Sequence, residues 1–117
     1  METTQAIDAL GALAQRSRLA AFRLLVQAGP QGLAAGEIGE HLALPPATLS
    51  FHLAHLVRAG LVSSRQEGRF VIYSANFENM NALVGYLSEK CCSGSACGPA
   101  ACKPAIPKGR RRAAAKA

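Results

Sequence analysis

Residues 45–61, PPATLSFHLAHLVRAGL, decide the fold of this chain. Leucines recur there at helical spacing, at positions Leu49, Leu53 and Leu56. This stripe predicts a helix that is buried along one side only. Pro46 suits the first helical position because its missing N–H has no intrahelical partner there. Gly60 suits the residue after the helix, where a positive φ is favoured.

The other side of this helix carries small, hydroxyl-bearing and imidazole-bearing residues and no acid. Its members are Ala47, Thr48, Ser50, Phe51, His55 and Arg58. A solvated helix usually presents Glu–Lys pairs on its outer side. This surface instead suits a partner with donors, acceptors and negative charge, and the major groove of DNA has those properties. We therefore expect Thr48, Ser50, Phe51 and His55 to face bases or nearby phosphates.

For two aromatic residues of the same helix, the sequence leaves two possible roles open. His52 lies next to the leucine stripe, so it is either a buried structural histidine or a further DNA contact. Phe51 either touches a thymine methyl group or covers a neighbouring apolar patch.

The surrounding sequence predicts a mainly α fold with a small β component (α+β). We expect helices over residues 3–14, 17–28, 33–42 and 77–90, and strands over residues 61–66 and 69–74. Ser17 is the expected N-cap of the second helix, and Asn76 or Ser74 that of the last.

A short helix, a turn of three or four residues and the helix at 46–59 form a helix-turn-helix. The hairpin that follows, with Glu67-Gly68 at its turn, makes this a winged helix-turn-helix. Arg65 and Arg69 lie near the tip of the wing, where they are expected to reach phosphates or the minor groove. The first and last helices carry more apolar surface than one small domain needs, so we expect a homodimer that pairs through them.

The composition predicts one domain at residues 1–90 and a basic tail at residues 91–117. The chain has 117 residues and a formal net charge of +6. The whole excess is in the tail, at Lys103, Lys108, Arg110, Arg111, Arg112 and Lys116. No apolar run is long enough to span a membrane, and the first residues lack the pattern of a secretory signal. We therefore expect a cytoplasmic protein.

All four cysteines, Cys91, Cys92, Cys97 and Cys102, fall within twelve residues after the last predicted helix. Three thiolates suit a soft three-coordinate ion such as As(III) or Sb(III). Cys91 and Cys92 supply two sulfurs, and either Cys97 or Cys102 supplies the third, with Cys97 the first choice. A Cd, Zn or Pb site, a redox disulfide and a tail without any ligand remain as alternatives.

The order of elements and the stretch ATLSFHLAHLVRAGLVSSRQEGRFVIYS, residues 47–74, resemble the ArsR family of metal-responsive winged-helix repressors. The resemblance covers residues 4–90 and rests on Leu49-Ser50, His52-Leu53, Leu56, Ala59-Gly60-Leu61-Val62, Gly68-Arg69 and Tyr73. It implies a homodimer that binds a palindromic operator and leaves it when an inducer binds.

The resemblance also narrows the place of the inducer site. Segment 33–44 lacks the cysteines of one arsenic-sensing type, and segment 77–90 lacks the His and Asp of the zinc-sensing type. The remaining match is with arsenite sensors whose cysteine site follows the last helix. The sequence therefore predicts an arsenite-responsive repressor of operator DNA, with no organic cofactor. No phosphate-binding glycine loop lies beside a cysteine, so an enzyme is not expected.

Overall fold

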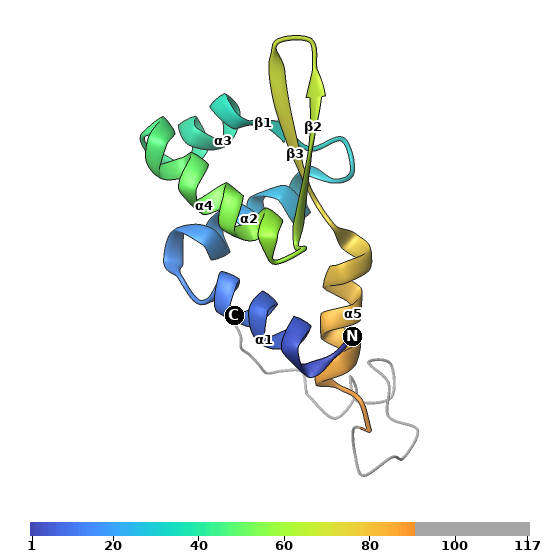
Figure 1. Ribbon diagram of the computed structural model, residues 1–117. Coiled ribbons are helices and arrows are strands. Elements are labelled where there is room, and N and C mark those ends of the chain that lie inside the picture. The colour runs from blue at the N-terminus through green and yellow to red at the C-terminus, as the bar shows by residue number, and fades with distance from the viewer. Residues whose placement is uncertain (91–117) are drawn as a thin grey trace, which may run out of the picture. The chain divides into compact units, whose positions relative to one another are not determined.

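The computed structural model describes residues 1–90, and residues 91–117 lie outside the described part. The elements are α1 (Thr3–Leu13), α2 (Arg16–Ala28), β1 (Leu33–Ala34), α3 (Ala35–Leu42), α4 (Pro46–Arg58), β2 (Val62–Glu67), β3 (Phe70–Ala75) and α5 (Phe77–Leu87) (Figure 1). The chain divides into two units at Val84 and Gly85, so α5 begins in the first unit and ends in the second. Within residues 1–90, every helix is too short or too polar to cross a lipid bilayer.

The predicted winged helix-turn-helix is confirmed. Helices α2, α3 and α4 pack on one another, and the β2–β3 hairpin extends beyond them as the wing (Figure 1). The leucine stripe of α4 is the centre of the core, because Leu49, Leu53 and Leu56 are at most 3% exposed. Phe22 and Leu25 of α2 and Ile38 of α3 are buried as well. Burial of this stripe fixes which side of α4 faces away from the domain.

The sheet has three strands rather than the two that the sequence predicts. The expected helix over 33–42 is wrong at its start, where Leu33 and Ala34 form β1 and pair antiparallel with Tyr73 and Ile72 of β3. Gly32 permits this pairing. Its φ is +74°, and a Cβ atom there would lie 2.3 Å from the carbonyl oxygen of Tyr73. A two-residue strand is too short to leave an alternation pattern in the sequence.

Two predicted helix ends are corrected, and one predicted N-cap is confirmed. The N-cap of α2 is Gln15, whose Oε1 accepts a hydrogen bond from the N–H of Arg18 at 2.9 Å, and Ser17 lies inside the first turn. Helix α5 ends at Leu87, short of the predicted Lys90. Its N-cap is Asn76, one of the two predicted residues, whose Oδ1 accepts from the N–H of Asn79 at 3.0 Å.

Helix α1 buries alanines and exposes its large side chains. Ala6, Ala9 and Ala12 are at most 2% exposed, whereas Ile7 and Leu10 are 62% and 42% exposed. Small residues let α1 lie close to the domain, and the large apolar side chains of Ile7 and Leu10 are left on the outside. An exposed stripe of this kind is typical of a surface that another chain covers.

Candidate DNA-binding surface

Both ends of α4 are fixed by backbone geometry. Pro46 occupies its first turn, as the sequence predicts. At the other end, the N–H of Gly60 donates to the carbonyl of Val57 at 3.0 Å, and the N–H of Leu61 donates to the carbonyl of Leu56 at 3.1 Å. Gly60 has a φ of +82°, which completes this two-bond termination. Leu56 and Leu61 are buried together below it, so the helix is held rigidly in the domain.

The outer side of α4 is exposed along its length. Ala47, Thr48, Ser50, Phe51 and Arg58 are exposed, and His55 is half-buried. Phe51 is 62% exposed, so it does not cover an apolar patch of its own domain. The structure thus brings Thr48, Ser50, Phe51 and His55 together on one accessible surface without an acid.

His52 belongs to the core side of the helix. It is only 9% exposed, and its ring meets the ring of Phe51 edge-on with 5.7 Å between centroids. Its Nδ1 atom is buried without a hydrogen-bond partner within the described residues. The predicted DNA contact is therefore corrected to the structural alternative, because a buried imidazole does not reach a base edge.

His55 lies in a positively charged environment. The pKa of His55 is lowered from its usual value, and burial is the main cause. The charges of Arg18 and Arg58 and the neighbouring His52 lower it further. These effects favour the neutral imidazole, which can both donate and accept a hydrogen bond.

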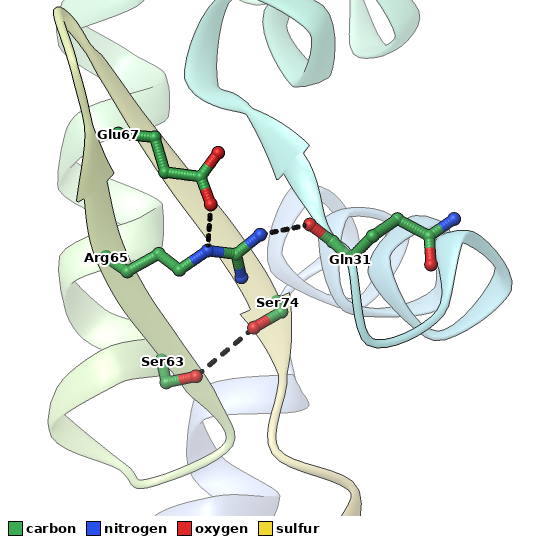
Figure 2. A network of polar contacts seen from close by, with 5 residues as sticks. All are labelled: Gln31, Ser63, Arg65, Glu67 and Ser74. Atoms are coloured by element: carbon green, nitrogen blue, oxygen red, sulfur yellow. Dashed lines mark hydrogen bonds and ion pairs between the residues drawn. The ribbon is translucent and has the colours of Figure 1, made fainter.

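Arg65 has a different position from the one expected. Its Nε atom lies 2.6 Å from a carboxylate oxygen of Glu67, and its Nη2 atom donates to the backbone carbonyl of Gln31 at 2.7 Å (Figure 2). Next to it, the hydroxyl groups of Ser63 and Ser74 lie 3.3 Å apart across the two strands. Arg65 therefore fastens the wing to the loop after α2, and its guanidinium is already engaged by two partners.

The tip of the wing carries Arg69 and an aromatic residue that the sequence analysis missed. Glu67 pairs with Phe70, so Gly68 and Arg69 form a two-residue loop, one residue later than predicted. Gly68 has a φ of +63°, as the first position of a type II′ turn requires. Arg69 is exposed, and Phe70 is 63% exposed. The sequence could have indicated this exposed aromatic residue. Residues Phe70-Val71-Ile72-Tyr73 are apolar on both faces of the strand, but the core can cover only one of these faces.

Comparisons with known proteins agree with this geometry. A family model described as a helix-turn-helix domain matches residues 13–65. The transcriptional activator HlyU of Vibrio cholerae is 32% identical over 90 residues, which are 77% of this chain and 81% of HlyU. The solved structure of HlyU covers 79% of this chain and 99% of its own, with a TM-score of 0.62 and 33% identity. A further HlyU structure, described as reduced, gives a TM-score of 0.61 at 32% identity over 77% of this chain and 92% of its own.

Two other solved structures are similar. The first is the domain of Mb0332 from Mycobacterium bovis, described as a homodimeric winged helix-turn-helix DNA-binding domain of a possible ArsR-family regulator. It is 27% identical with a TM-score of 0.60, over 80% of this chain and 86% of its own. The chain belongs to the ArsR family of winged-helix transcriptional regulators. The second, described as a possible transcriptional regulator for arsenical resistance, is 26% identical with a TM-score of 0.61, over 69% of this chain and 81% of its own.

Members of the ArsR family are DNA-binding regulators, and the exposed side of α4 is the surface that suits this role here. The predicted metal ligands Cys91, Cys92, Cys97 and Cys102 lie outside the described residues, so their arrangement stays a prediction. Among residues 1–90, no group of three or more His, Cys, Asp or Glu side chains is placed to hold a metal ion.

Proposed function

We propose that this ArsR-family protein is an arsenite-responsive repressor that binds operator DNA as a homodimer. The exposed, acid-free side of α4 carries the proposal. Thr48, Ser50 and Phe51 are presented there by a helix whose opposite side is locked in the core. Such a helix fits the major groove, where hydroxyl groups meet base donors and acceptors and a phenyl ring meets a thymine methyl group.

The exposed side of α1 supports the dimer. Ile7 and Leu10 form an apolar stripe in water, which a second copy of the same stripe covers across a two-fold axis. The similar Mb0332 domain is homodimeric. Two copies of α4 then enter successive major grooves about 34 Å apart.

The cysteines supply the proposed inducer site. Cys91 and Cys92 come four and five positions after Leu87, the last residue of α5, and Cys97 or Cys102 completes a three-sulfur set for As(III) or Sb(III). One similar structure is described as a possible regulator for arsenical resistance, which favours this inducer. Binding at the end of α5 changes the spacing of the two α4 helices, and a coupling of about 1–3 kcal/mol suffices for release.

An arsenite titration tests the proposal. Reduced protein is bound to a labelled fragment of the DNA upstream of its own gene, and fluorescence anisotropy follows release as sodium arsenite is added. The parent protein is expected to release DNA, whereas Cys91→Ser and Cys92→Ser stay bound. Loss of the response in Cys97→Ser or in Cys102→Ser identifies the third ligand. Retention of the parent's response in Cys91→Ser and Cys92→Ser contradicts the site.

Thiol oxidation is the second candidate, and a specific observation favours it. The relative HlyU has a structure described as that of the reduced protein. In this case diamide, which oxidises two thiols to a disulfide, releases the DNA and dithiothreitol restores binding, while arsenite has no effect. The same titration with Cd²⁺, Zn²⁺ and Pb²⁺ distinguishes other thiophilic ions. Because HlyU is named an activator, a reporter fused to the promoter decides between repression and activation.

A further inference from the structure

The wing carries an aromatic side chain that its own domain does not cover. Phe70 is 63% exposed at the first position of β3, and Val71 beside it is 37% exposed. Phe70 follows the two-residue loop Gly68-Arg69, so it lies next to the tip of the hairpin. An exposed phenyl ring costs free energy in water, about 2 kcal/mol relative to a buried one.

The register places Phe70 in a defined neighbourhood. Cross-strand partners share one face of a sheet, so Phe70 lies on the same face as Glu67, its partner, and as the next pair, Arg65 and Ile72. Glu67 is the acid nearest the tip on this face. Arg65 holds its carboxylate at 2.6 Å and is itself anchored on Gln31 (Figure 2).

Because Arg65 pairs with Glu67, the wing tip repels DNA phosphates only weakly. The negative charge of Glu67 is neutralised, and it is drawn toward the base of the wing by a guanidinium that bonds to the loop after α2. What the tip presents is the phenyl ring of Phe70 and the exposed guanidinium of Arg69. A cation beside an apolar wedge is the combination with which proteins enter a narrow minor groove and part adjacent base pairs.

We propose that Phe70 wedges against one base step of the minor groove that Arg69 is expected to reach. This inference rests on the proposed DNA-binding function and adds a second reading element to α4. The wedge favours pyrimidine–purine steps such as TA and CA, because these unstack most easily. Phe70 thereby selects sequence flanking the half-site that α4 reads.

The test compares Phe70→Ala, Phe70→Leu and Arg69→Gln with Val71→Ala as the matched control from the other face of the same strand. The operator duplexes carry a TA step beside the half-site, and 2-aminopurine replaces its adenine as a fluorescent reporter of unstacking. Binding is measured by fluorescence anisotropy from 50 to 300 mM salt, which gives the salt dependence of the affinity. Phe70→Ala is expected to weaken binding about tenfold. Its salt slope is unchanged because an apolar contact releases no counterion.

The other variants separate the two parts of the contact. Phe70→Leu keeps most of the affinity and the rise in 2-aminopurine fluorescence that reports unstacking, while Phe70→Ala loses that rise. Arg69→Gln lowers the salt slope by about two, one for each protomer of the dimer. Replacing the TA step by a GC step weakens the parent protein but not Phe70→Ala. Val71→Ala binds like the parent.

The outcomes distinguish this inference from the proposed function. If Ser50→Glu abolishes operator binding while Phe70→Ala binds like the parent, α4 reads DNA and the wedge is refuted. An equal loss in Val71→Ala and Phe70→Ala, or an unchanged 2-aminopurine signal in the parent complex, also overturns the wedge. If the parent binds no operator, both proposals fail.

Discussion

The side-chain amide of Asn79 donates a hydrogen bond from Nδ2 to the carbonyl oxygen of Gly60 at 2.8 Å. Gly60 follows the end of α4, and Asn79 lies in the first turn of α5, where its N–H donates a hydrogen bond to the Oδ1 of Asn76. The N–H of Asn76 in turn donates to the carbonyl of Leu61 at 2.8 Å. Two polar links therefore join the end of α4 to the start of α5, the helix that precedes the cysteines in the sequence.

Replacing Asn79 by alanine removes one of these links. Asn79→Ala is expected to lower the free energy of unfolding by about 1 kcal/mol, because the Gly60 carbonyl loses a partly buried donor. Urea denaturation followed by circular dichroism measures the change. Asn81→Ala, at an exposed position of the same helix, is the control and is expected to stay within about 0.5 kcal/mol of the parent.

In the same variants, arsenite-dependent release of DNA is expected to be weaker in Asn79→Ala only. An unaltered response in that variant means that the link carries no coupling.

The pair of Arg65 and Glu67 makes a prediction through a double-mutant cycle. Arg65→Gln frees the Glu67 carboxylate near the wing tip, so operator binding is expected to weaken by roughly fivefold, in keeping with the modest energy of an exposed pair. The double variant Arg65→Gln with Glu67→Gln is expected to regain most of this loss, since the repulsive charge is gone. Fluorescence anisotropy with operator DNA gives the dissociation constants of the parent, of Arg65→Gln, of Glu67→Gln and of the double variant. A double variant as weak as Arg65→Gln alone shows instead that Arg65 touches phosphate directly.

Operator binding is expected to depend on pH through His55. Burial, Arg18 and Arg58 lower the pKa of His55 in the free protein, whereas phosphates nearby raise it in the complex. Between these two pKa values, each protomer takes up a proton on binding, so affinity falls as the pH rises through that window, by at most about tenfold per pH unit for each His55 of the dimer. Dissociation constants measured from pH 5.5 to pH 8 test this. His55→Gln is expected to flatten the profile, whereas His41→Gln, at an exposed position in the last turn of α3, keeps the parent's slope.

Gly32 is expected to tolerate no side chain. Gly32→Ala combines a φ of +74° with a Cβ atom 2.3 Å from the carbonyl oxygen of Tyr73, so a loss of more than about 2 kcal/mol of unfolding free energy is expected. Thermal unfolding measures it. Gly11→Ala is the comparison, because a Cβ there meets nothing within 4 Å in the described chain and alanine favours the helix by up to about 1 kcal/mol. Similar stabilities for the two variants contradict the tight pairing of β1 with β3.

The sequence determined by itself the features whose signals are local and periodic. The spacing of Leu49, Leu53 and Leu56 fixed the buried side of α4, and Pro46 and Gly60 fixed its ends, because a helix repeats every 3.6 residues and the requirements of its termini are short-range. The hairpin followed from alternation around Gly68. The surface side of α4 was predictable for the same reason, since it is whatever the leucine stripe leaves outside.

Tertiary structure decided what depends on residues distant in the chain. Strand β1 exists because β3, some forty positions later, offers it a partner, and Arg65 bonds to the carbonyl of Gln31 because the fold brings that backbone group within reach. His52 is buried, and Ile7 is exposed where Ala6 and Ala9 are covered, because the neighbouring helices set how closely each face is packed. A periodic pattern shows that a helix has an apolar side, but only the packed neighbours decide which apolar side chains lie against this domain and which are left for another chain.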